Sequence, residues 1–261
     1  MKGILLAGGS GTRLSPLTKV ASKQLLPVFD KPLVYYPLST LMLAGIREIL
    51  IITAPTQVDT FRSLLGDGSS LGVELSYEIQ RVPRGIAESL IIGSSFVSGE
   101  KCALILGDNI FHGSGLGRRL SEFSTVQGSH VFGYTVKNPQ SYGVATIDSN
   151  GMVSKLEEKP SNPDSNIVIP GLYFFDEKAS QYARDLKPSL RGELEILALL
   201  DIYLSRQSLS LEMLPRGTAW FDSGTFQDMH DAATYVRLIE ERTGESVGDP
   251  VDVARTQGWI K

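Results

Sequence analysis

Apolar stretches of strand type alternate with stretches of helical periodicity through the first part of the chain. Short apolar runs bounded by turn-forming residues predict strands at 4–7, 49–53, 73–79 and 103–106. Apolar residues at helical spacing predict helices at 33–43 and 58–65. This alternation indicates an α/β fold with a largely parallel sheet, because helices between successive strands cover both faces of such a sheet.

The pattern becomes richer in strands after Gly107. Predicted strands follow at 131–136, 142–147, 153–158, 171–175 and 209–214. One long helix is predicted near 192–206, and a C-terminal helix at 226–242. We find no internal repeat and no low-complexity linker, so we expect one continuous domain over 1–261.

Composition and charge narrow the class of protein. The chain has 261 residues, of which 42% are hydrophobic, and this is enough for a substantial core. Its formal net charge of −4 argues against nucleic acid and anionic membranes as partners, so local groups must hold any phosphate ligand. The single cysteine, Cys102, lies in an apolar run and excludes a disulfide framework. No apolar run approaches membrane-spanning length, and we expect a soluble, cytoplasmic protein.

A glycine-rich segment, residues 8–14, directly follows the first predicted strand. Its glycines permit positive φ and close approach of backbone amides to phosphate, and Arg13 adds a forked, charged donor. A tight turn would explain the glycines alone, but Arg13 and the nearby Lys23-Gln24 favour phosphate. The segment lacks the Gly-Lys-Ser/Thr ending of a P-loop, and it has Leu14 where a dinucleotide fingerprint needs glycine or alanine. A nicotinamide-dependent reductase is therefore disfavoured.

Two aspartates follow short apolar runs, Asp108 after 103–106 and Asp222 after 219–221. Each alone is more often a turn former or a helix cap. Together they would suit Mg²⁺, which prefers oxygen ligands and keeps several waters. The three histidines are scattered along the chain, and we expect solvated or capping roles for them.

Several motifs, in one order, resemble the signature of the sugar nucleotidyltransferases, and residues 31–42 and 106–111 narrow the resemblance to the glucose-1-phosphate thymidylyltransferases. The resemblance covers nearly the whole chain, and its motifs are 6–14, 22–28, 31–42, 106–111, 157–160, 191–196 and 220–225. It implies a Rossmann-like three-layer α/β/α fold with a mostly parallel central sheet and an added strand-rich sugar-binding part. Residues 1–110 would mainly bind nucleotide, 111–225 sugar phosphate, and 226–261 would form a helical segment.

The resemblance also implies a reaction in which glucose 1-phosphate attacks the α-phosphorus of dTTP, giving dTDP-glucose and pyrophosphate. A phosphate oxygen is already a competent nucleophile, so charge neutralisation and alignment are the main tasks. The matching catalytic cations are Arg13, Lys23 and Lys159, and the matching Mg²⁺ ligands are Asp108 and Asp222.

Further positions match the binding residues of that family. Those implied for the nucleotide are Leu6, Gly8, Gly9, Gly11, Thr12, Arg13, Gln24, Gln80, Gly85 and Asp108. Those implied for the sugar phosphate are Asn109, Tyr142, Gly143, Glu158, Lys159 and Glu195. The same resemblance implies a homo-oligomer, either a dimer or a tetramer. Many relatives continue into further C-terminal helices, and these helices carry a regulatory nucleotide site.

The match weakens at two places. Arg84 and Glu88 stand where the thymidylyltransferases usually have aspartate and glutamine, and Leu197-Ala198 replaces threonine and aspartate. UTP is therefore an alternative to dTTP as a substrate, and another hexose 1-phosphate is an alternative to glucose 1-phosphate. A nucleotide-sugar-binding regulatory subunit without activity is a further alternative, although retention of both aspartates argues against it.

Overall fold

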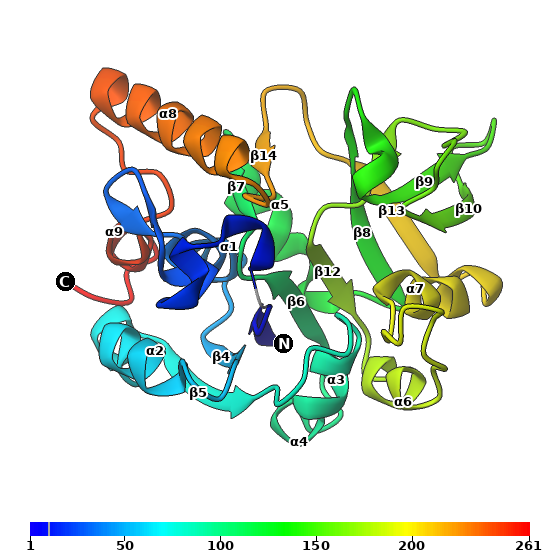
Figure 1. Cartoon of the computed structure of the whole chain (residues 1–261), viewed down its shortest axis with the longest axis horizontal. Coiled ribbons are helices and arrows are strands. Elements are labelled where there is room, and N and C mark those ends of the chain that lie inside the picture. Colours follow the sequence, from blue (N-terminus) through cyan, green and yellow to red (C-terminus); the bar gives the residue numbers. More distant parts are fainter. Residues whose placement is uncertain (10) are drawn as a thin grey trace.

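A computed structural model describes residues 1–9 and 11–261, and over these residues it has one ten-stranded sheet with helices on both faces (Figure 1). The strands are β1 Lys2–Ala7, β4 Glu48–Thr53, β5 Glu74–Ile79, β6 Cys102–Leu106, β8 Ser129–Thr135, β9 Gly143–Ile147, β10 Val153–Glu158, β11 Ile167–Val168, β12 Leu172–Phe175 and β13 Leu209–Met213. Their order is β10-β9-β11-β8-β12-β6-β1-β4-β5, and β13 pairs with β8.

The strands β6, β1, β4 and β5 pair in parallel and confirm the parallel sheet expected for the first part of the chain. Leu6 lies opposite both Ile52 of β4 and Leu106 of β6. The carboxyl ends of these strands therefore reach the same edge of the sheet, which is where ligands bind in open α/β folds.

The strands after β6 follow a different pattern. β12 runs antiparallel between β6 and β8, and β9, β10 and β11 are also joined by antiparallel pairing, whereas β13 is parallel to β8. The later half thus extends the parallel strands into a mixed sheet. The sheet runs without interruption from β5 to β10 across both predicted halves.

Helices cover both faces of the sheet, as the three-layer prediction requires. The α-helices are α1 Tyr35–Leu43, α2 Val58–Leu65, α3 Glu88–Ile92, α4 Ser94–Val97, α5 Leu116–Ser121, α6 Ala179–Arg184, α7 Ile196–Ser205, α8 Phe226–Thr243 and α9 Pro250–Thr256. Short 3₁₀ turns are Thr12–Leu14, Leu17–Lys19, Lys23–Leu25, Ser69–Leu71, Glu122–Thr125 and Pro139–Ser141. Two small sheets pair β2 Pro27–Val28 with β3 Lys31–Pro32, and β7 Ile110–His112 with β14 Ala219–Phe221.

Alternation of side chains along the strands divides the core between the two faces. Leu5 and Ile51 pack with apolar residues of α1, α2, α5 and α9. Ile4 and Leu50 point the other way and pack with α3, α4, α6 and α7. A third cluster, which includes Val28, holds α8 against β2, β7 and the start of α1. No helix in the described ranges is long and apolar enough to cross a membrane.

The helix predicted near 192–206 begins only at Ile196, because tertiary contacts hold the preceding residues extended. Leu194 N–H donates to the Arg84 carbonyl at 2.7 Å, and the Leu194 carbonyl accepts from Ala87 N–H at 3.1 Å. These bonds use backbone groups that a helix would need for itself. The C-terminal helix begins at Phe226 as predicted, where Thr225 and Asp228 form a reciprocal capping box.

The expectation that all three histidines are solvated or capping is wrong for His130. This side chain is buried and stacked on Phe123, with ring centroids 3.7 Å apart. Its Nδ1 lies 2.8 Å from Ser210 Oγ, and its Nε2 has no partner in the described residues. Burial lowers the pKa of His130 to about 4.

We therefore expect stability to fall on acidification. In the unfolded chain, His130 takes up a proton at its ordinary pKa of 6.5. The part of the free energy of unfolding that depends on this protonation is therefore fully present above pH 6.5 and is lost as the pH falls towards 4. At pH 5 the loss is about 2 kcal/mol. Denaturant unfolding at pH 7 and pH 5 should show a smaller pH effect for His130→Phe than for the wild type. The exposed His230→Phe is the matched control, and an undiminished pH effect in His130→Phe would contradict the assignment.

Candidate active site

Two adjoining cavities open at the carboxyl ends of the parallel strands, with volumes of about 540 and 340 Å³. Both are lined by Arg13, Asp108, Glu158 and Lys159. The larger cavity extends over the strand-rich half, and we call it the sugar-side cavity after the ligand that the sequence resemblance leads us to expect there. The smaller cavity extends over β1 and β5, and we call it the nucleotide-side cavity for the same reason. Most of the charged residues singled out in the sequence thus meet on one continuous surface.

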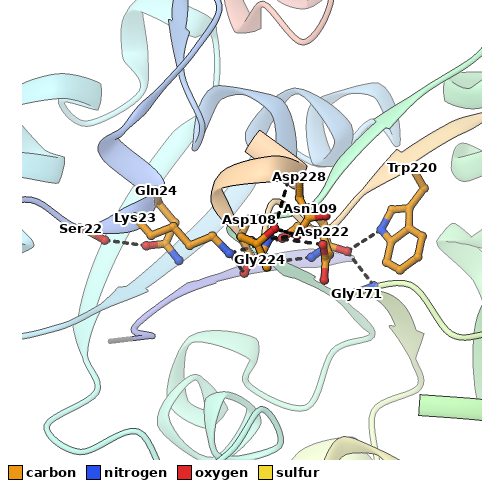
Figure 2. A network of polar contacts seen from close by, with 11 residues as sticks. Ser22, Lys23, Gln24, Asp108, Asn109, Gly171, Trp220, Asp222, Gly224 and Asp228 are labelled. Carbon is orange, nitrogen blue, oxygen red and sulfur yellow. Dashed lines mark hydrogen bonds and ion pairs between the residues drawn. The ribbon is translucent and has the colours of Figure 1, made fainter. Parts of the chain in front are cut away.

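Asp108 follows β6 and is held by a buried lysine from the start of the chain. Lys23 Nζ donates to Asp108 Oδ2 at 2.8 Å and lies 3.4 Å from the Asp222 carbonyl oxygen (Figure 2). The Lys23 side chain is only 6% exposed, compared with 27% for Asp108. Lys23 therefore faces the two predicted metal ligands and does not itself line either cavity. Lys23 thus connects the segments of Asp108 and Asp222, which are far apart in the sequence.

Asn109 connects this ion pair to the sugar-side wall. Its amide donates to Asp108 Oδ1 at 2.8 Å, and its Oδ1 accepts from Gly171 N–H at 3.0 Å and from the Trp220 indole N–H at 2.7 Å (Figure 2). The residue is 2% exposed. Because each polar end of this amide is used, Asn109 fixes the orientation of the Asp108 carboxylate.

Asp222 lies between β14 and α8, beside the same lysine. Burial, with the neighbouring carboxylates of Asp228 and Asp108, raises its pKa, and the Gly224 N–H and Lys23 offset part of that rise. Negative charge therefore accumulates where Asp108 and Asp222 meet. A bound cation would relieve this repulsion.

The two carboxylates, Asp108 and Asp222, suit Mg²⁺ better than a metal ion that is coordinated entirely by protein side chains. Nowhere in 1–9 or 11–261 do three or more His, Cys, Asp or Glu residues form a possible metal site. Two carboxylates remain, and Mg²⁺ is usually held by one or two carboxylates together with substrate phosphates and waters. Asp108 and Asp222 are thus sufficient in number and kind for this ion.

Aromatic rings and a pair of charges form the sugar-side cavity. Tyr142 and Trp220 meet edge to face, with centroids 5.3 Å apart. Burial raises the pKa of Tyr142 to about 12, so this phenol stays neutral and can both donate and accept. Lys159 lies 3.3 Å from Glu158 Oε1 and adopts a φ of 47°. Lysine seldom adopts this left-handed conformation, and such strain is often found at functional sites.

The nucleotide-side cavity is shaped by Gln80 and two glycines. A Cβ on Gly8 would collide with the Oε1 atom of Gln80, so the Gln80 side chain would have to shift if another residue stood there. Gly85 has a φ of 101°, and a Cβ there would collide with the Leu194 carbonyl. Gln80 is 3% exposed and donates to Glu88 Oε2 at 2.8 Å.

Most of the predicted site residues line one or both of the cavities. The nucleotide-side cavity includes Leu6, Gly9, Arg13, Gln24, Gln80, Gly85 and Asp108. The sugar-side cavity includes Asn109, Tyr142, Gly143, Glu158, Lys159 and Asp222. Gly8, Gly11 and Thr12 do not line either cavity, and Ser10 of the glycine-rich segment lies outside the described residues. Glu195, expected with the sugar, lines the nucleotide-side cavity instead.

Trp220, Tyr173 and Arg191 are among the residues that join the site without having been singled out individually by the sequence. Trp220 and Tyr173 line the sugar-side cavity. Arg191 Nη2 lies 3.1 Å from Glu158 Oε1 and 3.0 Å from Glu195 Oε1, and so holds together two carboxylates that line the nucleotide-side cavity. The motifs 191–196 and 220–225 contain Arg191 and Trp220 and were the only sequence signal for these two residues. Neither the pattern nor the spacing of a motif indicates which of its side chains points into the site.

One sequence departure also lies here. Leu197 lines the sugar-side cavity, and a Cβ on Gly143 would lie 2.9 Å from its Cδ1 atom. The neighbouring Ala198 is not part of either lining. An apolar group therefore replaces a polar one on this wall of the cavity.

Comparison with known proteins identifies the family. The family model described as Nucleotidyl transferase matches residues 2–237. The chain belongs to the nucleotidyl transferase family. A Mycolicibacterium smegmatis relative named glucose-1-phosphate thymidylyltransferase is 55% identical over 260 residues, covering 100% of this chain and 90% of the relative. A Xanthomonas campestris relative of the same name is also 55% identical, covering 99% and 88%.

Solved structures of other nucleotidyl transferases have the same architecture. A Bacillus anthracis protein assigned as a glucose-1-phosphate thymidylyltransferase, in complex with sucrose, has a TM-score of 0.84 and 38% identity, covering 91% of this chain and 95% of its own. A UDP-glucose pyrophosphorylase in complex with UDP-glucose has a TM-score of 0.79 at 23% identity, covering 91% and 98%, and supports the fold alone. The three-layer nucleotidyl transferase fold expected from the sequence is confirmed.

In this nucleotidyl transferase, we expect Asn109→Ala to lower the free energy of unfolding by about 2–3 kcal/mol, because it leaves buried Gly171 and Trp220 donors unpaired. Denaturant unfolding provides the measurement. Asn138→Ala, at an exposed position, is the control. Equal stability of the two variants would show that Asn109 does not organise the site.

Proposed function

We propose that this chain transfers a thymidylyl group from dTTP to glucose 1-phosphate, giving dTDP-glucose and pyrophosphate. The observation that carries the proposal is the meeting of Arg13, Asp108, Lys159 and Asp222 in the linings of two adjoining cavities, with Lys23 bound to Asp108 behind them. Relatives 55% identical over nearly the full chain, named glucose-1-phosphate thymidylyltransferase, support the same activity.

The central task of the site is to bring two anions together. Arg13 and Lys159 line both cavities and so stand where a triphosphate and a sugar phosphate would meet. Arg13 can hold phosphate oxygens with its fork, whereas Lys159 offers a point charge to the attacking phosphate. In this arrangement the side chains lower the repulsion between the reactants and align the sugar phosphate with the α-phosphorus.

Asp108 and Asp222 would hold Mg²⁺, which supplies charge neutralisation on the phosphates when bound. The role of Lys23 is to keep Asp108 in place and to offset the charge of both carboxylates. Asn109 orients the same carboxylate from the other side. No side chain needs to remove a proton from the nucleophile, because the sugar phosphate is already ionised at neutral pH.

The substrates would divide between the cavities. Gln80 and Gly85 lie where the base of dTTP would enter, and Asn109, Tyr142 and Glu158 line the space for the hexose. The uninterrupted sheet supports a single domain over 1–261. A homo-oligomer and a cytoplasmic location remain part of the proposal through the resemblance to the family.

A panel of nucleoside triphosphates against sugar 1-phosphates tests the reaction directly. With Mg²⁺, we expect pyrophosphate release to be fastest with dTTP and glucose 1-phosphate. Faster turnover with UTP or another hexose 1-phosphate would move the assignment to a related transferase. A protein that binds dTDP-glucose but releases no pyrophosphate with any pair would instead be a regulatory subunit.

Lys159→Met should weaken the use of glucose 1-phosphate, because one charge-assisted phosphate contact is worth roughly 1.5–3 kcal/mol, or about 10- to 150-fold in kcat/KM. Steady-state kinetics with varied glucose 1-phosphate provide the measurement. Lys155→Met, on the strand that leads to Lys159 but outside both cavities, is the matched control. If both variants have wild-type kinetics, Lys159 does not contact the sugar phosphate.

Asp108→Asn should remove most magnesium-dependent turnover while leaving the fold intact, because it halves the anionic donor set for the cation. Turnover should be titrated with Mg²⁺, and thermal unfolding should be recorded alongside. Asp185→Asn, at an exposed position, controls for the loss of a carboxylate. Near-normal activity of a folded Asp108→Asn protein would exclude the proposed metal role.

A further inference from the structure

Gly224 lies in the turn between β14 and α8, close to Asp222 (Figure 2). A Cβ atom on Gly224 would lie 3.2 Å from Asp222 Oδ2, 3.2 Å from Arg13 Nη1 and 3.3 Å from Arg13 Nη2. These distances are shorter than the roughly 3.5–4.0 Å at which non-bonded atoms normally pack. The guanidinium fork of Arg13 and one oxygen of Asp222 therefore occupy the space that a side chain at position 224 would need.

The backbone of Gly224 does not itself require glycine. Gly224 is not among the glycines that have a positive φ, whereas the neighbouring Ser223 has a φ of 46°. An alanine could therefore adopt the backbone conformation of Gly224 without strain. What glycine provides at this position is the absence of a side chain.

Hydrogen bonds hold the turn on both sides of Gly224. Its own N–H donates to Asp222 Oδ1 at 3.2 Å. The Thr225 N–H donates to Asp228 Oδ2 at 2.8 Å, and Thr225 Oγ1 accepts from the Asp228 N–H at 3.2 Å. Gly224 is buried, whereas Arg13 is exposed. A methyl group at position 224 would therefore displace the end of the long Arg13 side chain before it moved the turn.

The position beside Gly224 is the one from which Arg13 reaches the site. In this position Arg13 lines both cavities, and Asp222 lines the sugar-side cavity. Burial is the main cause of the raised pKa of Tyr142, and among the charges near it Asp222 raises that pKa further while Arg13 lowers it. Because the guanidinium and Asp222 lie beside each other, one phosphate group could bind the guanidinium and still lie next to the carboxylate proposed to hold Mg²⁺.

We propose that Gly224 is a positioning residue, which leaves the space over the turn free so that the Arg13 fork lies beside Asp222 and binds the triphosphate. This inference rests on the proposed function, since it takes Arg13 as a ligand of the triphosphate. Gly224 acts through Arg13, because its own N–H already bonds to Asp222. Adding one methyl group at position 224 should thus weaken triphosphate binding without removing any group that binds phosphate.

Equilibrium binding of inorganic triphosphate tests this role, because the probe needs no base pocket. In calorimetric titrations with Mg²⁺, Gly224→Ala should bind the probe roughly tenfold more weakly than the wild type, as expected when one hydrogen bond between charged groups is lost. Thermal unfolding should be nearly unchanged, since only the exposed end of Arg13 has to move. A variant that does not fold would show that the turn itself fills the space, and would overturn the inference.

A double-mutant cycle shows whether the methyl group acts through Arg13. Arg13→Met keeps a long side chain but removes the fork, so in this background Gly224→Ala should change the affinity for triphosphate by less than about twofold. The same tenfold loss in both backgrounds would place the effect on Asp222 or on the turn, and would overturn the inference. Equal affinity of the wild type and Gly224→Ala would also overturn it, as would a wild type that does not bind the probe.

Gly117→Ala is the matched control for adding a methyl group to a closely packed glycine. A Cβ on Gly117 would lie 3.2 Å from Leu43 Cδ2, and neither Gly117 nor Leu43 lines either cavity. This variant should bind triphosphate with the affinity of the wild type.

The outcome for Gly224 and the outcome for the reaction can be told apart. If the affinities are as expected but the wild type releases no pyrophosphate from dTTP and glucose 1-phosphate, the role of Gly224 is supported and the proposed reaction is overturned. If the wild type releases pyrophosphate but Gly224→Ala has the same effect with and without the Arg13 fork, the reaction stands and the role of Gly224 is overturned.

Discussion

Parallel pairing of β6, β1, β4 and β5 is the constraint on which the rest of this structure depends. Because these strands point the same way, Gly8, Gln80 and Asp108 follow their carboxyl ends at one edge of the sheet. None of these residues is close to another in sequence. The register between the strands thus brings these residues together, as a contiguous motif would in a shorter segment. Apolar packing on both faces of the sheet keeps the register fixed.

Charge then has to be balanced where the strands end. Asp108 and Asp222 repel each other in a partly buried position, and Lys23 stabilises both without entering either cavity. The cations that do line the cavities, Arg13 and Lys159, are therefore not needed to hold these two carboxylates, and under the proposed function they would bind phosphate. This division between a buried structural cation and accessible binding cations would let the site keep its shape before any substrate arrives, which reduces the reorganisation that the reaction requires.

Sequence patterns predicted what depends on local periodicity and missed what depends on tertiary partners. The strand 153–158 and the start of the helix at Phe226 were predicted at the observed residues, because a short run bounded by turn-forming residues and the helical spacing of apolar residues are local signals. The start of α7 was placed too early, since Leu194 is held extended by bonds to a distant loop. Likewise, the spacing of Asn109 and Trp220 gives no sign that the indole N–H would reach the amide.

Departures from a family pattern are best judged by what the changed residues contact. Taken singly, Arg84 and Glu88 weaken the resemblance at the base pocket, and each would place an unusual charge beside it. In the fold they form one unit, because the guanidinium satisfies the carboxylate that Gln80 also contacts. Either substitution alone would leave a charge without its partner, a cost that rises steeply with burial. The two changes therefore form one coupled replacement, which keeps Gln80 hydrogen-bonded. They are not two independent losses of residues that the pocket needs.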